Sequence, residues 1–225
     1  MNNEYNEEVW EDIGINGLKI AQNTGLYRFT SDSVLLSKFV KAKRGEKVAD
    51  FCAGSGIVGL HFYALNPTVQ SVTFFELQEE LSALSQKTID YNGLTNFTAV
   101  CCPIQQIAQE YRESFSLILV NPPYETGGFE NQDYKKAICR KEITVNLAEI
   151  ADAAYRNLKY GGRLAMVHRA DRLAEIFTVL SNRGIEPKRM QLVSGKANDK
   201  PYLVLVEGTK GGKHGLEVLP TLVNK

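Results

Sequence analysis

The sequence predicts an α/β protein built on one mostly parallel sheet of seven strands, with helices on both faces and an antiparallel pair of strands that closes the sheet. Short apolar runs alternate with amphipathic segments from residue 47 onward, and the connections between them are short. The run Phe115–Val120 is apolar throughout, as expected for a central strand that is covered on both faces. The 225 residues, of which 44% are hydrophobic, fit a single domain spanning residues 1–225.

In the first half of the chain, each strand is a short apolar run, and each helix is recognised by its apolar spacing and its stop signal. The first helix stops at Asn66-Pro67 and the second at Asn92-Gly93. The expected strands are Lys47–Phe51, Ser71–Phe75, Phe97–Cys101 and Phe115–Val120, and the expected helices are Gly56–Leu65, Gln78–Tyr91 and Ile104–Tyr111.

In the second half, the apolar period continues, and the last two strands are joined by a polar loop rich in Gly, Asn and Asp. Such a connection is typical of two antiparallel strands, which here would close the sheet. The expected elements are a helix at Val145–Leu158, a turn at Lys159–Gly162, a strand at Arg163–Val167, a helix at Arg172–Asn182, and strands at Met190–Val193 and Tyr202–Val206.

The composition excludes several classes of protein. The longest aliphatic runs fall far short of the about 20 residues that a membrane-spanning helix needs, and the acidic start at residues 1–12 is unlike a signal peptide. The four cysteines, Cys52, Cys101, Cys102 and Cys139, have no CxxC spacing, which argues against a disulfide scaffold or a zinc ribbon. We therefore expect a cytoplasmic protein without a metal site and without membrane contact.

The charges are distributed unevenly along the chain, although the formal net charge is zero. Residues 1–133 hold 9 Lys/Arg and 17 Asp/Glu, whereas residues 134–225 hold 17 Lys/Arg and 9 Asp/Glu. This polarity predicts an anionic partner that meets mainly the C-terminal half, and nucleic acid is the first candidate. The alternative is that the charged blocks average out on the folded surface.

A glycine-rich segment follows the first expected strand and opens the first expected helix. Gly54-x-Gly56-x-x-Gly59 matches the dinucleotide-binding fingerprint, because glycines allow positive φ angles and a close approach of a ligand to the backbone. Glu76 ends the next strand, where an acid can bind ribose hydroxyls. A nucleotide-containing cofactor is predicted, and a tight turn without a ligand is the alternative.

Asn121-Pro122-Pro123-Tyr124 directly follows Phe115–Val120 and so sits at the carboxyl end of a central strand, over the expected ligand crevice. The two prolines stiffen the loop, which leaves the Asn121 side-chain oxygen and the Pro122 carbonyl as two fixed acceptors. These acceptors match the two N–H donors of a planar exocyclic amino group, and Tyr124 offers a face on which a flipped base can stack. We assign residues 121–124 to catalysis on an amino group.

Asp50 stands four residues before Gly54, whereas dinucleotide dehydrogenases have no acid in front of their first glycine. This arrangement resembles motif I of the class I S-adenosyl-L-methionine-dependent methyltransferases, with Cys52 in place of the usual first glycine, and Asn-Pro-Pro-Tyr resembles motif IV of their amino-group members. The resemblance implies a Rossmann-like class I methyltransferase fold and S-adenosyl-L-methionine as the cofactor. The cofactor-binding residues that it implies are Asp50, Cys52, Ala53, Gly54, Gly56, Glu76, Leu77 and Asn121.

The chain also resembles, over roughly residues 15–222, the small bacterial tRNA methyltransferases that modify N6 of adenine 37 beside the anticodon of a valine tRNA. The segments that carry this resemblance are Ile20–Gln22, Tyr27–Leu36 and Glu207–Leu222. It implies that residues 1–45 cover the cofactor and the substrate and that residues 207–225 form a C-terminal tail. We infer no obligatory protein partner. The residues that it places near the methionine part of the cofactor are Gln22, Phe29, Thr30 and Asp32.

One segment departs from that family. Its members carry an acid just after the third strand, where the adenine of the cofactor binds, but Cys101-Cys102-Pro103-Ile104 holds no carboxylate. We expect Pro103, Ile104 and backbone groups to hold this part of the cofactor instead, with weaker affinity.

The basic half of the chain agrees with an RNA substrate, whose binding should then depend on salt. A single-stranded loop adenine can be splayed out at little cost, which suits it better than a paired one. The residues expected to contact RNA are Tyr124, Lys135, Lys136, Arg140, Lys141, Arg169, Lys210 and Lys213.

Three alternatives remain open at this point. The same chemistry could act on a protein glutamine or on another nucleic-acid amino group, although glutamine methyltransferases carry an N-terminal helical domain. A non-catalytic RNA-binding protein with a vestigial cofactor site is the second, and a nicotinamide-dependent oxidoreductase is the third. Because methyl transfer needs no strong base, we assign no catalytic role to His61, His168 or His214.

Overall fold

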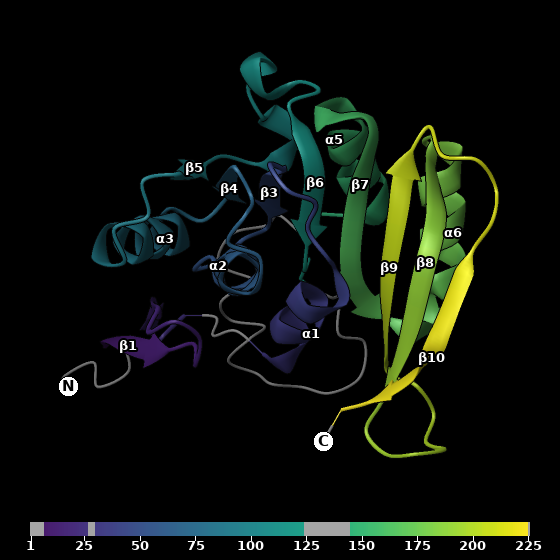
Figure 1. Ribbon diagram of the computed structural model, residues 1–225, viewed down its shortest axis with the longest axis horizontal. Coiled ribbons are helices and arrows are strands. Elements are labelled where there is room, and N and C mark those ends of the chain that lie inside the picture. The colour runs from purple at the N-terminus through teal and green to yellow at the C-terminus, as the bar shows by residue number, and fades with distance from the viewer. Residues whose placement is uncertain (1–6, 27–29, 124–144, 225) are drawn as a thin grey trace.

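A computed structural model describes residues 7–26, 30–123 and 145–224 of the chain. The described residues contain an eight-stranded sheet in the order β10-β8-β9-β7-β6-β3-β4-β5, and a separate hairpin of β1 and β2 (Figure 1). β3, β4, β5, β6 and β7 are mutually parallel, whereas β9 runs antiparallel to both of its neighbours. The expected α/β class, with a mostly parallel sheet and an antiparallel closing pair, is confirmed.

The strands of the large sheet end where the polar loops of the sequence begin. Residues 117–120 of the central strand β6 alternate, with Leu117 and Leu119 on one face of the sheet and Ile118 and Val120 on the other. The bounds are β3 (Lys47–Phe51), β4 (Ser71–Glu76), β5 (Phe97–Cys101), β6 (Phe115–Val120), β7 (Leu158–Arg169), β8 (Ile185–Ser194), β9 (Leu203–Lys210) and β10 (Glu217–Val223).

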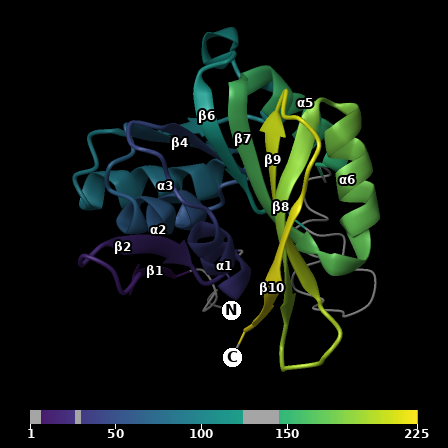
Figure 2. The same ribbon diagram turned by 45° about the vertical axis from the view of Figure 1, so that its right-hand side comes forward.

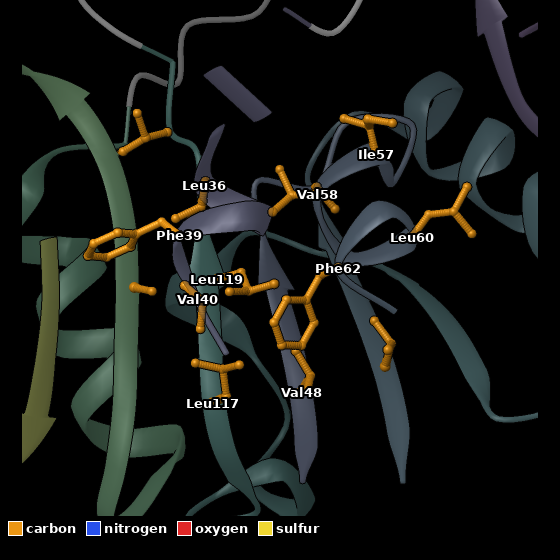
Figure 3. Packing of buried hydrophobic residues seen from close by; sticks show 14 of the residues in the cluster. Leu36, Phe39, Val40, Val48, Ile57, Val58, Leu60, Phe62, Leu117 and Leu119 are labelled. Carbon is orange, nitrogen blue, oxygen red and sulfur yellow. The ribbon is translucent and has the colours of Figure 1, made fainter. Parts of the chain in front are cut away.

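Helices cover both faces of the sheet (Figure 2). One face packs against α1 (Ser31–Phe39), α2 (Ile57–Leu65) and α3 (Glu79–Tyr91), and the other against α5 (Leu147–Asn157) and α6 (Leu173–Asn182). Figure 3 shows the first of these cores, in which Phe62 of α2 and Val48 of β3 lie beside Leu117 of β6. Because helices cover both faces, the loops gather at the ends of the strands.

The N-terminal elements were not among the expected ones. β1 (Glu8–Asp12) and β2 (Lys19–Asn23) form an antiparallel hairpin, and β2 lies against α3. The amide N–H of Ala21 donates to the Thr88 hydroxyl, which ties this hairpin to the helix. α1 follows and packs on α2, the helix that opens after the glycine segment.

Three expected elements differ in the structure. Ile104–Tyr111 is not one helix but two short 3-10 turns, Ile104–Gln106 and Gln109–Tyr111. The expected turn Lys159–Gly162 lies inside β7, which bulges there against β6. The segment 207–225, expected as a tail, supplies the end of β9 and all of β10, which pairs parallel with β8 and raises the strand number from seven to eight.

Within the described residues, the structure holds no helix that is both long and apolar enough to cross a membrane.

Candidate active site

The carboxyl ends of the parallel strands gather at one edge of the sheet, beside α1 (Figure 1). β3 and β6 pair directly, with Phe51 opposite Val120. The glycine segment leaves β3 at this edge, and Asn121-Pro122-Pro123 leaves β6 beside it. The sheet therefore brings together two motifs that lie about seventy positions apart in the sequence, as expected for ligand sites of open α/β sheets.

The glycine segment adopts a left-handed turn at three positions. Cys52 has a φ of 56°, Gly54 a φ of 59° and Gly56 a φ of 93°. A Cβ on Gly56 would lie 2.8 Å from the Phe74 ring, so packing as well as backbone angle requires glycine there. Cys52 keeps the positive φ that the usual glycine would have, which is uncommon for a residue with a side chain.

Two buried acids hold this turn in place. Asp50 Oδ2 accepts a hydrogen bond of 2.8 Å from the N–H of Gly59, and Glu76 Oε2 accepts one of 2.8 Å from the N–H of Gly54. Glu76 Oε1 also accepts from the N–H of Gln78, at 2.9 Å. Burial raises the pKa of Glu76. Each carboxyl group has more acceptor sites than these hydrogen bonds use, so both acids retain acceptor capacity for a ligand.

Gln22 of β2 reaches the same turn. Its side chain is fully buried, and its Nε2 donates to the Ser55 hydroxyl at 2.5 Å. Among the described residues, Gln22 Oε1 and Asp50 Oδ1 have no hydrogen-bond partner although both are buried. Buried acceptors without partners are costly, so their presence next to a glycine turn points to a polar ligand that supplies N–H donors.

Asn121 is held by a residue that sequence reasoning did not single out. Its Nδ2 donates to the hydroxyl of Ser33 at 3.0 Å, and Ser33 is buried in the first turn of α1. This contact fixes the orientation of the amide. Pro122 is buried and Pro123 half-buried, which keeps the loop after β6 against the protein.

The other residues expected near the cofactor lie around this turn. Thr30 is the exposed residue just before α1, and half-buried Asp32 has a pKa raised by burial. Leu77 and Pro103 follow β4 and β5, and the N–H of Cys102 donates to the Glu76 carbonyl. The Ile104 side chain is buried in the core on the α5 face.

Two of the residues expected to contact RNA do not lie on the surface around Asn121. Lys210 is buried, and its ammonium donates to Glu113 and to the carbonyls of Tyr155 and Leu158. Lys210 therefore holds the fold together and does not face RNA. Lys213 is exposed, but it follows the end of β9, at the edge of the sheet opposite Asn121 (Figure 1).

Other cations do lie at the same end of the sheet as Asn121. Arg169 ends β7 and forms an ion pair with Asp171, and Lys196 and Lys200 are exposed on the connection between β8 and β9. Their position follows from the strand order, which the sequence alone did not provide. The remaining expected residues, Phe29, Tyr124, Lys135, Lys136, Arg140 and Lys141, lie outside the described residues.

Substitution of Lys210 by methionine is expected to lower the melting temperature without changing RNA affinity. The change removes a buried cation from three acceptors, two of which are backbone carbonyls, at a cost of roughly 1–3 kcal/mol. Thermal unfolding and RNA titration measure the two effects. Lys213→Met is the matched control, with no loss of stability expected because its side chain is exposed. A loss of RNA affinity in Lys210→Met at unchanged stability would contradict this account.

A small pocket opens beyond the ends of β6 and β7, with a volume of about 140 Å³. Its walls include Pro122, Pro123, Leu147, Ile150, His168 and Arg172. Elsewhere, no group of His, Cys, Asp and Glu side chains in the described part of the chain could hold a metal ion.

Residues 28–182 match the model of the methyltransferase small-domain family. The chain belongs to this family. The nicotinamide-dependent oxidoreductase is thereby excluded as a reading of the glycine segment, and the methyltransferase is of the S-adenosyl-L-methionine-dependent kind. Similar curated proteins are the tRNA1(Val) (adenine(37)-N6)-methyltransferases of Shewanella sediminis, 24% identical over 77% of this chain and 72% of the relative, and of Shewanella baltica, 26% identical over 80% and 77%.

Solved structures resemble this methyltransferase in fold. A predicted O-methyltransferase of Agrobacterium tumefaciens superposes with a TM-score of 0.68, at 19% identity over 85% of this chain and 86% of the other. TYW2 of M. jannaschii, solved in complex with AdoMet, gives a TM-score of 0.61 at 12% identity over 93% of this chain and 87% of the other. The Rossmann-like methyltransferase fold is confirmed.

The residues of this methyltransferase fit its cofactor. The left-handed turn at Gly54 leaves open space where a side chain would stand, and the unpartnered oxygens of Gln22 and Asp50 can accept from an amino group. Glu76, which ends β4, retains lone pairs for ribose hydroxyls. The described residues from Cys101 to Ile104 offer no carboxylate to the cofactor adenine, as the sequence indicates.

Asp50 makes the stability of the cofactor-free methyltransferase depend on pH. Burial raises its pKa from 3.8 to about 7, with a further increase from Glu76, against the hydrogen bond from Gly59. Between about pH 4 and 7 the native state therefore holds a proton on Asp50 that the unfolded chain has released. The free energy of unfolding falls as the pH rises through this window. Asp50→Asn is expected to flatten the dependence of melting temperature on pH, since its amide oxygen can still accept from Gly59.

Scans of melting temperature between pH 5 and 8 on the wild type and on Asp50→Asn measure this effect. Parallel curves for the two proteins would refute the assignment to Asp50. A Glu79→Gln variant, altered at the start of α3, is the control for a general change of charge.

Proposed function

We propose that the protein methylates the exocyclic N6 of an adenine in tRNA, namely adenine 37 in the anticodon loop of a valine tRNA. The observation that carries this proposal is the position of Asn121-Pro122-Pro123 on the strand next to the glycine turn. A cofactor bound at the turn and an amino group bound at Asn121 would then lie on neighbouring strands. The names of the curated relatives support tRNA and the N6 position.

The loop after β6 has the acceptors that an amino group needs. Because Asn121 Nδ2 donates to Ser33, the amide oxygen Oδ1 forms the acceptor end of this side chain. Pro122 has a carbonyl and no N–H, so it can only accept. Two acceptors on the two N–H groups of adenine N6 draw the nitrogen lone pair away from the ring and toward an incoming methyl carbon.

The chemistry asks mainly for orientation. S-adenosyl-L-methionine, when bound, supplies a methyl group that its sulfonium already activates. The substrate nitrogen forms the new N–C bond as the methyl–sulfur bond breaks and the sulfur keeps its electron pair. The nitrogen then loses one proton to water, because that proton becomes acidic as the N–C bond forms. Asn121 and Pro122 hold that nitrogen in place throughout, and their contribution is positional and electrostatic.

Positive charge at the end of the sheet that carries the site supports a nucleic-acid substrate. Arg169, Arg172, Lys196 and Lys200 lie at the carboxyl ends of β7 and β8 or just beyond them. Contacts of such cations with phosphates give an affinity that falls with salt. The described N-terminal region consists of the hairpin of β1 and β2 followed by the short helix α1.

The test incubates the purified protein with S-adenosyl-L-methionine and unmodified bulk tRNA, digests the RNA and measures N6-methyladenosine by mass spectrometry. Asn121→Ala is the matched control, with cofactor binding measured on both proteins. N6-methyladenosine that forms only with the wild type supports the proposal. If the cofactor binds and no methylated adenosine forms, the tRNA substrate is wrong, and a protein glutamine becomes the next substrate to assay.

A further inference from the structure

Asn224, the residue that follows β10, joins three elements at the end of the sheet that carries the site. Its backbone N–H donates to the carbonyl of Ser194, the last residue of β8, at 2.9 Å. Its side-chain Nδ2 donates to the hydroxyl of Tyr202 at 2.9 Å and, at 3.4 Å, to the hydroxyl of Ser31 in α1. The end of the chain therefore ties the connection between β8 and β9 to the helix that orients Asn121.

Tyr202 is an aromatic residue that these contacts hold at the surface, with 43% of it exposed. Its N–H donates to the carbonyl of Val193 at 2.9 Å, and its carbonyl accepts from the N–H of Ala170 at 3.0 Å. The backbone and the hydroxyl of Tyr202 are thus both fixed. A side chain that is fixed in this way loses little conformational freedom when a ligand packs against it.

Tyr202 and the proposed catalytic loop are both connected to the first turn of α1. Tyr202 reaches Ser31 through Asn224. Asn121 donates to Ser33, two positions farther along the same helix. In the sheet, β7 alone separates β6 from β9, which places these two strands about 10 Å apart. Because neighbouring nucleotides of a stacked strand are about 3.4 Å apart, an unpaired segment of a few nucleotides can reach both places.

The connection that leads to Tyr202 is basic. Lys196 and Lys200 are exposed on it, and Asp199 is the single acid among residues 195–202. Figure 1 shows this connection beyond the end of the sheet at which β6 and β7 end, with the C-terminus beside it. Proteins that bind single-stranded nucleic acid combine such cations, which contact phosphates, with an aromatic ring on which a base stacks.

We propose that Tyr202 is a stacking platform for an unpaired nucleotide beside the target adenine, and that Lys196 and Lys200 bind phosphates of the same strand. Asn224 is then a positioning residue, because it holds the ring through its hydroxyl. The ligand class is single-stranded RNA, since the bases of a duplex are already stacked on one another. This inference rests on the proposed function and adds to it the place at which the strand next to the adenine is held.

The test measures the Kd of a synthetic anticodon stem–loop of the valine tRNA for wild type, Tyr202→Leu and Tyr202→Phe, with S-adenosyl-L-homocysteine present to prevent turnover. We expect Tyr202→Leu to weaken binding about tenfold, as for one lost base stack, and Tyr202→Phe, which keeps the ring, to lose less. Tyr160→Leu is the matched control, because Tyr160 is 81% exposed near the start of β7, at the other end of the sheet. Melting temperature and affinity for S-adenosyl-L-methionine should stay near wild type in all three variants.

The same proteins are then titrated with stem–loops that lack the base of the nucleotide on one side or the other of the target adenine. If Tyr202 stacks on one of these bases, its removal weakens binding to the wild type about tenfold and to Tyr202→Leu no further. Equal affinity of wild type and Tyr202→Leu for the intact stem–loop, or equal losses in both proteins on each abasic stem–loop, overturns the inference. A stem–loop that binds as expected but is not methylated refutes the proposed function alone, and a wild type that does not bind it overturns both.

Discussion

Replacement of Asn121 by alanine is expected to lower the kcat of methyl transfer by about 10²–10³-fold, while the affinity for S-adenosyl-L-methionine changes little. The change removes the amide that Ser33 orients and with it one of the two acceptors for the substrate amino group. The buried turn at Gly54 and its partner Glu76 lie on other strands and stay as they are. Single-turnover methylation and cofactor titration separate the two effects.

Ser33→Ala provides a graded companion to this variant. It leaves the Asn121 amide in place but removes the hydroxyl that accepts from its Nδ2 at 3.0 Å. We expect about a tenfold loss of turnover, since an amide without this partner can rotate out of position. Equal loss of turnover and cofactor affinity in Asn121→Ala would show instead that Asn121 supports the cofactor loop.

Substitution of Arg163 by methionine is expected to destabilise the protein by about 3–5 kcal/mol, the range for removing one partner of a buried ion pair. Arg163 donates to Glu46 at 2.9 Å and to Glu207 at 3.1 Å, and all three side chains are nearly buried. Both carboxylates would stay in the interior without this cation. Arg189, 3.8 Å from Glu207, compensates in part, which favours the lower end of the range.

For a chain of this size, that loss lowers the melting temperature by about 6–20 °C. Arg183→Met is the matched control, because Arg183 pairs with Asp152 on the surface, where such pairs contribute about 0–1 kcal/mol. Turnover below the transition should be unchanged in both variants, since Arg163 lies at the start of the pairing between β7 and β9, away from Asn121. A shift in Arg163→Met no larger than in the control would refute the buried-network account.

The strands of the central sheet could be predicted from the sequence because burial on both faces leaves an unbroken apolar run. Phe115–Val120 is the plainest case, and its predicted bounds match β6. The two motifs were placed correctly for the same reason, since each follows such a strand. Local pattern was sufficient here because local pattern and tertiary environment agree.

Where tertiary contacts override local pattern, the sequence was misleading. Ile104–Tyr111 has helix-like apolar spacing, but the Tyr111 ring stacks on Phe115 and meets Phe75 edge to face, and the chain between bends into two short turns. A segment of eight residues has little helical stability of its own to resist such packing.

The same holds at the site. Lys210 looks like a surface cation in a Gly-rich stretch, and only its contact with Glu113, 97 positions earlier, shows that it is buried. Ser33 lies 88 positions from Asn121, so no local signal marks it as a partner. Both ion pairs, Lys210 with Glu113 and Arg163 with Glu46, join the basic half of the chain to the acidic half and neutralise part of the charge asymmetry.

The strand order has a consequence for synthesis on the ribosome. β9 is the penultimate strand of the chain, yet it lies between β7 and β8 in the sheet. Until residues 203–210 have emerged, β7 has an open edge, and Glu113 lacks its ion-pair partner Lys210. A nascent chain of this topology can only form a partial sheet with an aggregation-prone border, and chaperone contact during translation would protect it until the last strands insert.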